Sequence, residues 1–555
     1  MTGAGDFFLR DVAEGAVLVE YAGPSDEDAN RRAVSRARSL AERWPAGLLA
    51  AVPGARTLLV EFDPRRLSRA RLARVLRSDA GAADSSTGRV LRIPVFYGAD
   101  PAIGPDLPEL AREAGLSAEE FSRRHSGADY RVAFLGFAPG FAYLRGLPGE
   151  LHAARLSTPR TRVPAGSVGI GGSLTGIYPG ETPGGWRLIG RAPVRLFEAS
   201  RDPPALLLPG DTVRFEPITR EDFESRRAIL ETSRKTMSSP GSGSPLFRVI
   251  APGALTSVQG VPRRGWEIYG VPPGGAMDLQ SLAFGNALLG NPVRAAALEM
   301  TLVGPELEVL AEAAILLTAA ALEASLNGRP VAAGQPLRVR AGDHLSIGPL
   351  RGAARGYLCV AGGLARPDRP GPPQRLASGD TVFADSRRRA GLPARAAGPD
   401  PLVSGRERTI RVLPGPQRER FEPEGIATFL NGVYRVSSSS DRRGIRLEGP
   451  PVENRGASDI PPEGTTLGGI QVPKDGKPII LGPDRPVTGG YARIATVIAA
   501  DFRLVAQAPP GAPLRFVQVT LAEALAASSP SPESRIPRAG SRITRHGRGL
   551  ERRRG

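Results

Sequence analysis

Cysteine and histidine are scarce in this sequence. Its 555 residues include one cysteine, Cys359, and four histidines, at positions 125, 152, 344 and 546. A single cysteine excludes both an internal disulfide framework and a cysteine metal cluster. The histidines are too widely spaced to match the usual pattern of metal ligands. The sequence therefore predicts no metal-ligating residues.

Long apolar runs are also absent. No run reaches the roughly 18–20 residues that span a bilayer. The nearest, Ala313 to Leu322, is bracketed by Glu312 and Glu323, so we expect a buried strand or a short helix there. The N-terminus lacks the basic start and apolar stretch of a signal peptide. We therefore expect a cytoplasmic protein with no membrane partner.

Lysine is nearly missing, although the net charge is +17. Only three of the 73 basic residues are lysine, and the arginine excess accompanies many alanines, glycines and prolines, which indicates a composition bias. Residues 526–555 hold eight arginines against Glu533 and Glu551, so this tail supplies +6. Its composition predicts disorder. Because no aromatic residues interleave with the arginines, we expect no specific nucleic-acid site.

The first part of the chain alternates strand and helix patterns. Apolar β-formers predict short strands at Val17–Tyr21 and Leu58–Phe62. Ser25–Trp44 carries small and apolar residues at helical spacing, and a second helix is expected at about Arg66–Arg77. Residues 1–90 are therefore predicted to form a small α/β unit.

The rest of the chain is rich in short strands separated by glycine and proline turns. Residues 91–230 form one predicted β-rich block, in which Ser117 and Glu120 predict the start of a short helix. Residues 231–245, rich in Ser, Pro and Gly, predict a flexible linker. A second β-rich block is expected over 246–525, before the basic tail.

The two β-rich blocks share a weak internal sequence similarity. Pro164–Gly172 ends in a double glycine and is followed by the run TPGGW from Thr182. Pro462–Gly469 ends in the same way and is followed by TGGY from Thr488. A threonine, two glycines and an aromatic residue at matching places predict related barrels on either side of the linker.

The first block contains three long runs of low degeneracy: FLGFAPGFAYL from Phe134, TPRTRVPAGSVGI from Thr158 and GGWRLIG from Gly184. In these runs it resembles the family of allophanate hydrolase subunit 1, also known as KipI or the B subunit of 5-oxoprolinase.

The second block contains the runs GVPP from Gly270, VAGG from Val360, SDR from Ser440, RLEG from Arg446, QVP from Gln471 and TGGY from Thr488. In these and other runs it resembles the partner family, allophanate hydrolase subunit 2, also known as KipA or the C subunit of 5-oxoprolinase. The resemblance implies a mainly β fold with a small N-terminal α/β unit and cyclophilin-like β-barrels, one in the first half and two in the second. It also implies a separate partner protein, the 5-oxoprolinase A subunit.

The implied activity is ATP-dependent hydrolysis of the small molecule 5-oxoproline to glutamate. An unstrained lactam resists water, so ATP, accompanied by Mg²⁺, would convert the lactam oxygen into a phosphate ester that can leave. Arg160 and Arg162 suit bidentate contacts to phosphate or carboxylate. The backbone around Gly166, Ser167 and Gly169 could form an anion-binding nest. Tight turns and surface ion pairs are the alternative roles of these residues.

Four residues of the second block are predicted to be catalytic. Gln471 and Thr488 could bind an amide or a carboxylate, Asp484 could orient a water, and Tyr491 stands beside them. Turn stabilisation is the alternative role. Glu299 and Asp278 are further acids of interest, and the remaining predicted substrate- or phosphate-binding residues are Arg442 and Arg446. We expect the glycine-rich rims of the two halves to enclose a shared pocket near Arg162 or Gln471.

Several features depart from the expected patterns. No P-loop sequence G-x-x-x-x-G-K-[ST] is present. The second block lacks the family's usual Gly-Ser-Arg-Ser-Thr loop, near residues 364–378. Acids that are common in the family are replaced at Gly260 and Ala321, and Pro462 stands where serine is common. Loss of polar groups predicts weakened or altered turnover more than a loss of folding.

Two other functions stay open. The chain could be a carboxyltransferase-like component of a urea carboxylase or allophanate system, although it has no Met-Lys-Met biotin-attachment motif. It could instead be a KipI/KipA-type regulator of a sensor histidine kinase. Fusion of an inhibitor to its antagonist makes the regulatory function the less favoured of the two.

Overall fold

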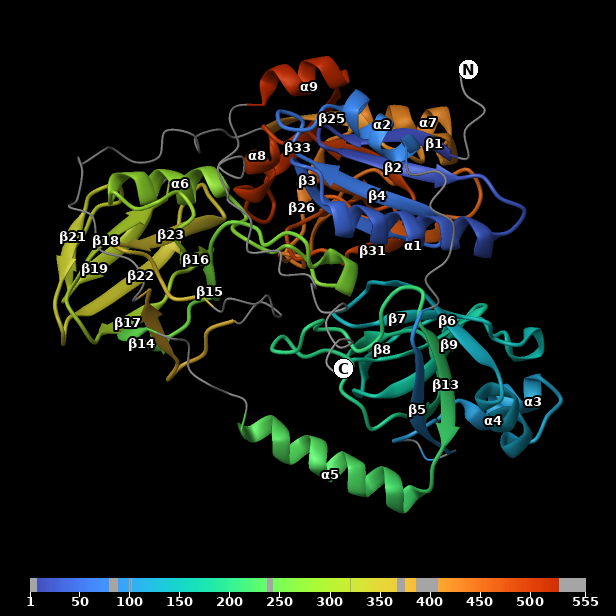
Figure 1. Cartoon of the computed structure of the whole chain (residues 1–555). Helices are drawn as coiled ribbons and strands as arrows, with labels where there is room; N and C mark the ends of the chain where they lie inside the picture. Colours follow the sequence, from blue (N-terminus) through green and yellow to red (C-terminus); the bar gives the residue numbers. More distant parts are fainter. Residues whose placement is uncertain are drawn as a thin grey trace, which may run out of the picture.

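The computed structural model contains a small α/β unit and three β-rich units (Figure 1). The mainly β fold class is confirmed. No helix within the described part of the chain is long and apolar enough to cross a membrane. The structure describes residues 7–78, 88–98, 100, 102–236, 243–319, 321–366, 375–385 and 408–528.

The N-terminal unit is an antiparallel sheet with strand order β1-β2-β4-β3. Helix α1 packs on this sheet, and Ser25 caps it by accepting a hydrogen bond from the backbone N–H of Asp28. The strands and helices predicted here are confirmed. Their bounds are β1 (Phe7–Ala13), β2 (Ala16–Tyr21), α1 (Asp26–Arg43), β3 (Leu48–Pro53), β4 (Thr57–Phe62) and α2 (Arg69–Ser78).

The first barrel is a closed ring of seven strands in the order β5-β12-β9-β10-β7-β6-β13, with β13 parallel to β5. Ser117 caps α4, as predicted. The bounds are β5 (Val90–Tyr97), α3 (Leu107–Glu113), α4 (Ala118–Ser126), β6 (Asp129–Leu135), β7 (Ala142–Arg145), η1 (Gly149–Leu151), β8 (Arg160–Val163), β9 (Ser167–Gly171), β10 (Leu174–Ile177), β11 (Thr182–Gly184), β12 (Arg187–Arg191) and β13 (Thr212–Pro217).

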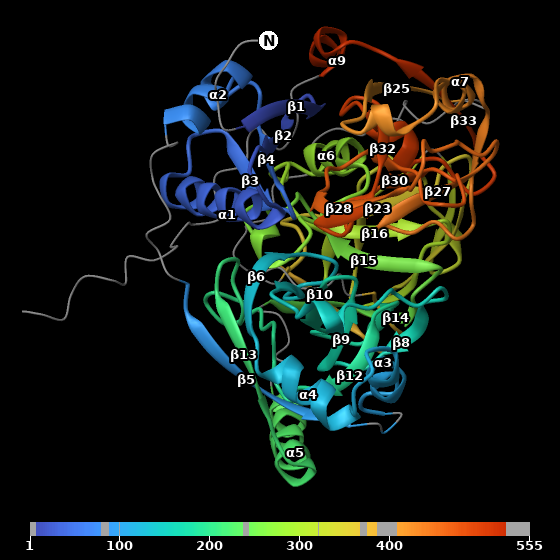
Figure 2. The same cartoon turned by 90° about the vertical axis from the view of Figure 1, so that its right-hand side faces the viewer.

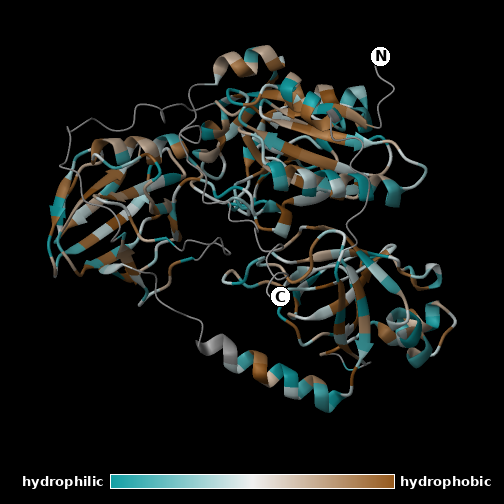
Figure 3. Ribbon diagram, in the orientation of Figure 1, coloured by the Kyte–Doolittle hydropathy of each residue, from teal (hydrophilic) through white to brown (hydrophobic). Residues whose placement is uncertain are grey.

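Helix α5 (Arg220–Thr236) leaves the first barrel and is mainly hydrophilic (Figure 3). The helix extends into the segment 231–245 that was predicted to be a flexible linker, and strand β14 begins at Ser244. Residues 237–242 lie outside the described part of the chain, as do residues 529–555 of the predicted tail.

The middle unit consists of two sheets, with strand orders β20-β19-β22-β17-β14-β24 and β15-β16-β23-β18-β21. One apolar core includes side chains of both sheets, and isolated bridges at Val303 and Leu364 lie at their edges. Helix α6 packs on the second sheet. The bounds are β14 (Ser244–Ala251), β15 (Leu255–Gln259), η2 (Glu267–Tyr269), α6 (Leu279–Leu288), β16 (Ala297–Thr301), β17 (Glu306–Val309), β18 (Ala313–Thr318), β19 (Leu322–Leu326), β20 (Arg329–Pro330), β21 (Leu337–Val339), β22 (His344–Leu350), β23 (Arg355–Val360) and β24 (Thr381–Ala384).

The last unit is a second closed ring of seven strands, in the order β25-β32-β29-β30-β27-β26-β33. We call it the third barrel, because it is the third β-rich unit along the chain. The bounds are β25 (Arg408–Pro414), η3 (Arg418–Arg420), α7 (Pro423–Asn431), β26 (Tyr434–Val436), β27 (Gly444–Glu448), β28 (Asp459–Gly464), β29 (Gly469–Gln471), β30 (Ile479–Leu481), β31 (Thr488–Tyr491), β32 (Arg493–Val497), α8 (Phe502–Ala506), β33 (Pro513–Gln518) and α9 (Leu521–Ala527).

The two closed barrels have the same topology. In each ring the first strand along the chain lies between the last two, pairing parallel with the last and antiparallel with the one before it. Each barrel also carries an outlying two-stranded sheet, β11-β8 in one and β28-β31 in the other. The runs that begin at Thr182 and Thr488 lie on the matching strands β11 and β31, so the predicted relationship between the barrels is confirmed.

The N-terminal unit packs against the third barrel, far away in sequence (Figures 1 and 2). The Ala55 N–H donates to the Pro462 carbonyl over 2.7 Å. Gly464 faces Leu59 so closely that the space between them has no room for a Cβ on this glycine. The first half of the chain is therefore interlocked with the second.

Candidate functional site

A cavity of about 910 Å³ lies where the N-terminal unit, the segment before α6 and the third barrel meet. The β1–β2 turn and the end of β4 line one side, and residues 273–280 with α6 line another. The remaining wall comes from the third barrel and α9. Both halves of the chain therefore contribute to one pocket.

Most of the pocket wall is apolar. Phe62, Phe284, Leu467 and Phe502 are among the lining residues. Charged side chains are set into this wall; they are Glu14, Glu61, Asp63, Arg65, Arg264, Asp278, Arg485 and Arg503. An apolar pocket with a few fixed charges is the usual form of a small-molecule site.

Asp278 is held by five donors at the start of α6. Its Oδ1 accepts the N–H groups of Gln280 and Ser281, which caps the helix. Its Oδ2 accepts from the Ser281 hydroxyl, the Arg503 Nε and the Gln507 Nε2. This buried carboxylate therefore fixes Arg503, from α8, in the pocket wall.

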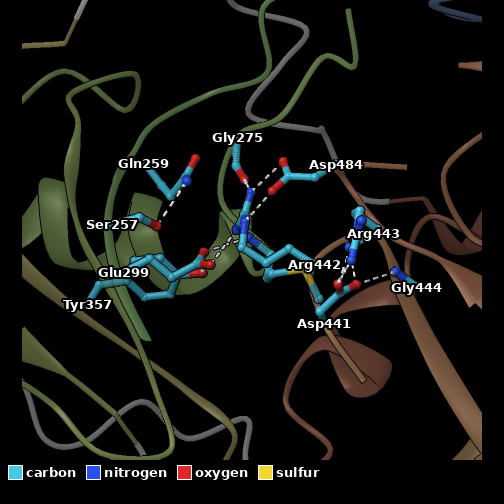
Figure 4. Close-up of polar contacts among 11 residues, drawn as sticks. Ser257, Gln259, Gly275, Glu299, Tyr357, Asp441, Arg442, Arg443, Gly444 and Asp484 are labelled. Atoms are coloured by element: carbon cyan, nitrogen blue, oxygen red, sulfur yellow. Dashed lines mark hydrogen bonds and ion pairs between the residues drawn. The ribbon is translucent and has the colours of Figure 1, made fainter. Parts of the chain in front are cut away.

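Arg442 is the centre of a buried ionic network behind the pocket wall (Figure 4). Its guanidinium forms a bidentate pair with Asp484, at 2.8 and 3.0 Å, and a second ion pair with Glu299. It also donates to the Gly275 carbonyl over 2.6 Å. Burial opposes the charge on Arg442, but the two carboxylates outweigh burial and raise its pKa.

Glu299 connects the Arg442 network to the pocket wall through hydrogen bonds. One carboxylate oxygen accepts the Met277 N–H at 2.7 Å and the Tyr357 hydroxyl at 2.9 Å. The Tyr357 oxygen in turn accepts the Asp278 N–H at 2.8 Å. Residues 275–278 are therefore held at three points, which preorganises one wall of the pocket.

A second buried network joins the two halves of the chain. Glu61, at the end of β4, accepts from the Thr466 hydroxyl at 2.8 Å and from Arg485 at 3.2 Å. Its other oxygen accepts from Arg264 at 2.6 Å. Burial works against the charged carboxylate, but the two arginines outweigh it and lower the Glu61 pKa. Glu267 lies 3.5 Å from the same Arg264 guanidinium.

Burial raises the pKa of Glu267 to about 7. The folded protein therefore binds a proton here that the unfolded chain has already lost, between about pH 4.5 and 7. Stability is expected to fall as the pH rises through this window. In Glu267→Gln, which mimics the neutral acid, we expect urea unfolding at pH 8 to show a gain of up to about 3 kcal/mol over wild type, and little difference at pH 5. An equal gain at both pH values would contradict this assignment.

The predicted residues of the second half do not converge on one pocket. Asp484 and Arg442 pair with each other behind the wall, and Gly274 and Arg485, next to them, line the pocket. Gln471 is buried against Gly489, and Tyr491 is 40% exposed.

Thr488 lies at the contact between the barrels, where its hydroxyl group occupies the position that a Cβ on Gly136 would take. Arg446 is exposed on β27. The two halves therefore do meet near these residues, but the pocket that they share lies elsewhere, and it includes neither Gln471 nor Arg162.

The predicted arginines of the first half lie on the outlying strand β8. Arg160 donates to Asp106 over 2.8 Å. Arg162 is exposed and forms an ion pair with Glu181. The surface ion pairs named as the alternative role are thus present.

The glycine-rich run of the first half, predicted as an anion-binding nest, makes close contacts within the first barrel. The N–H groups of Gly166 and Ser167 already donate to backbone carbonyls, and Ser167 opens strand β9. A Cβ on Gly169 would approach Trp186 to 3.2 Å, and one on Gly171 would lie 2.6 Å from the indole. Gly169 and Gly171 therefore make room for the Trp186 ring.

One of the noted departures, Gly260, lies against Arg366. A Cβ on Gly260 would lie 2.9 Å from the Arg366 guanidinium, which donates to the Val261 carbonyl. Residues 367–374 of the shortened loop lie outside the described part of the chain. Within the described residues, no group of three His, Cys, Asp or Glu side chains could hold a metal ion.

Comparisons with known families divide the chain into two parts. The family described as carboxyltransferase domain, subdomain C and D, matches residues 8–207. Subdomain A and B of the same domain matches residues 269–518.

Each half of the chain is also similar to a different named protein. The B subunit of 5-oxoprolinase from Escherichia coli O157:H7 is 42% identical over 208 residues, which cover 37% of this chain and 94% of that protein. The C subunit of 5-oxoprolinase from Escherichia coli K12 is 34% identical over 295 residues, covering 51% of this chain and 94% of that protein. The chain is a fusion of the families of the 5-oxoprolinase B and C subunits. Its B half, residues 7–236, and its C half, residues 243–528, together build the pocket.

One solved structure and one further protein are also similar to this chain. The crystal structure of TTHA0988 superposes on the B–C fusion with a TM-score of 0.77 at 34% identity, and it covers 92% of this chain and 100% of that one. The urea amidolyase of Lachancea kluyveri is 33% identical over 309 residues, which are 49% of this chain but only 17% of that protein.

Proposed function

We propose that the fusion is the B–C component of an ATP-dependent 5-oxoprolinase, which hydrolyses 5-oxoproline to glutamate together with a separate A subunit. The observation that carries the proposal is the pocket shared by the two halves, each of which matches a different subunit of that enzyme. A pocket that needs both halves gives a reason for both to act in one reaction.

The pocket suits a small cyclic amino-acid derivative. Its apolar wall suits the ring carbons of such a ligand, and the fixed charges suit its carboxylate and lactam groups. Arg503 and Arg485 supply positive charge inside the wall. A volume of about 910 Å³ is near the upper end of the range for small-molecule pockets and exceeds the needs of one five-membered ring, so it supports a second ligand such as ATP.

In this proposal the nucleotide brings its own Mg²⁺, since the described residues offer no ready-made metal site. The Arg442–Asp484–Glu299 network acts as a positioning group for residues 275–278. Gln471, Thr488 and Tyr491 stay predicted catalytic residues, and they lie outside the pocket wall.

The test is reconstitution. The purified fusion is mixed with an A subunit from the same source, ATP, Mg²⁺ and 5-oxoproline, and glutamate and ADP are measured. Both products are expected only in the complete mixture. Glutamate that does not exceed the level without the fusion, at any ATP concentration, would overturn the proposal.

A carboxyltransferase activity of a urea carboxylase system is the second candidate. The match to the Lachancea kluyveri urea amidolyase favours it. Carboxylation of urea when the fusion is supplied with carboxylated biotin, together with no release of glutamate, would establish this candidate in place of the first.

A further inference from the structure

Four acids line the pocket, and they differ in how their charge is balanced. Glu61 and Asp278 each bind arginines, and all their oxygens already accept hydrogen bonds. Asp63 is half-buried and accepts the N–H of Arg65. Glu14 is different, because it is 8% exposed and forms no ion pair within the described residues.

Glu14 lies in the turn between β1 and β2, which inserts from the B half against the third barrel. One carboxylate oxygen accepts the Ala499 N–H at 2.8 Å. The nearest charged groups are Asp501, which repels it, and Arg411, which attracts it. Arg411 is already engaged in a bidentate pair with Asp501, at 2.9 and 2.6 Å.

Burial is the main influence on the Glu14 carboxyl and raises its pKa, while the backbone N–H groups of Glu14 and Ala499 oppose this. Burial makes such a carboxyl a stronger proton acceptor than an exposed one, and this suits a group that takes up a proton and later returns it. The other buried acids of the pocket wall, Glu61 and Asp278, are instead paired with arginines.

We propose that Glu14 is the proton-transfer residue of the pocket, supplied by the B half to a reaction held in place by the C half. This inference rests on the proposed function.

The proton balance of the reaction assigns two tasks to this residue. When the lactam oxygen bonds to the γ-phosphorus of ATP, the bond from phosphorus to ADP breaks and the ring nitrogen loses its proton, which Glu14 accepts. Water then adds to the ring carbon and the carbon–nitrogen bond breaks, which leaves an acyl phosphate. A second water cleaves the acyl phosphate to the carboxylate and inorganic phosphate. The proton returns from Glu14 to the departing nitrogen, and water supplies the others. One residue can serve both steps because the proton leaves and rejoins the same atom.

The first experiment compares Glu14→Gln with wild type in the reconstituted reaction. Glutamine keeps an oxygen that can accept the Ala499 N–H, so folding is preserved, which a thermal melt checks. We expect kcat to fall by about 10²–10⁴-fold with a small change in KM, and the acid limb of the pH–rate profile to disappear. Asp11→Asn, which removes an exposed acid of β1, is the matched control and is expected to retain wild-type kcat. A kcat of Glu14→Gln within threefold of wild type would overturn the inference.

The second experiment needs no turnover. The Glu14 carboxyl is observed by carbon-13 NMR in the full chain, assigned by its absence in Glu14→Gln, and titrated with and without 5-oxoproline. Binding is expected to shift its titration midpoint. A shift without glutamate release would support the role of Glu14 while rejecting the proposed hydrolysis. A midpoint that 5-oxoproline leaves unchanged would reject the inference even if the reconstituted enzyme is active.

Discussion

Replacement of Arg442 by methionine is expected to lower the free energy of unfolding by about 3–5 kcal/mol. The reason is the surroundings of the guanidinium: Glu299 is fully buried, Asp484 is nearly so, and both would lose their shared counter-charge. The Gly275 carbonyl would also lose its donor. Urea unfolding at neutral pH, followed by fluorescence, measures the loss.

The neighbouring arginine provides a matched control. Arg443 forms an ion pair with Asp441 on the surface, with 68% of its side chain exposed (Figure 4). Arg443→Met is therefore expected to cost at most about 1 kcal/mol. Adding Glu299→Gln and Asp484→Asn to Arg442→Met removes the unpaired charges and is expected to recover part of the stability. Equal effects of the two arginine substitutions would show that the network does not hold the pocket wall.

Replacement of Trp186 by alanine is expected to cost about 3–5 kcal/mol. The buried indole covers the glycines of β9 and meets the rings of Phe141 and Tyr143 edge-on, at centroid distances of 5.4 and 5.7 Å. Its removal leaves a cavity over residues that carry no side chains to fill it. Thermal and urea unfolding of the full chain measure the loss.

Combining the loss of the Trp186 ring with a larger residue at Gly171 tests whether the two residues pack against each other. Gly171→Ala alone is expected to be destabilising, because the new methyl group would lie 2.6 Å from the indole. In the Trp186→Ala background the same methyl group is expected to be neutral or stabilising, which a double-mutant cycle detects. Tyr491→Ala, at the exposed aromatic position of the other barrel, is expected to change stability by about 0.5 kcal/mol or less. Additive effects of Gly171→Ala and Trp186→Ala would contradict the packing role.

Local sequence patterns predicted the helices and strands of the N-terminal unit well, because each pattern lies within a few neighbouring residues. Helix α1 has apolar residues at helical spacing and a serine cap, and β2 and β4 are dense in apolar β-formers. The relationship between the two closed barrels was also detectable, because their outlying strands repeat one threonine and glycine pattern. The two-sheet form of the middle unit could not be predicted from the sequence. Whether a sheet closes into a barrel depends on contacts between strands that are distant in the sequence.

The pocket was largely hidden from sequence reasoning. Glu14, Glu61 and Arg503 lie in no recognisable motif, and they meet only because the N-terminal unit packs on the third barrel. Arg442 was selected from a family run and Asp484 as an acid beside the predicted catalytic residues, and the structure brings them together as a buried pair. The sequence did not decide between the two roles of the glycine run, because glycine serves close packing and anion binding equally well; the structure places Trp186 against Gly169 and Gly171.

The pairing of Glu61 with Thr466 has a consequence for biosynthesis. The two residues are separated by 405 positions, so a ribosome adding about 5–20 residues per second needs roughly 20–80 s to supply the partner. During that interval the nascent N-terminal unit presents Leu59 and an uncompensated Glu61 to its surroundings. The newly made first half is therefore a candidate client for chaperones until the last barrel emerges, and its solubility in isolation should depend on what covers that one face.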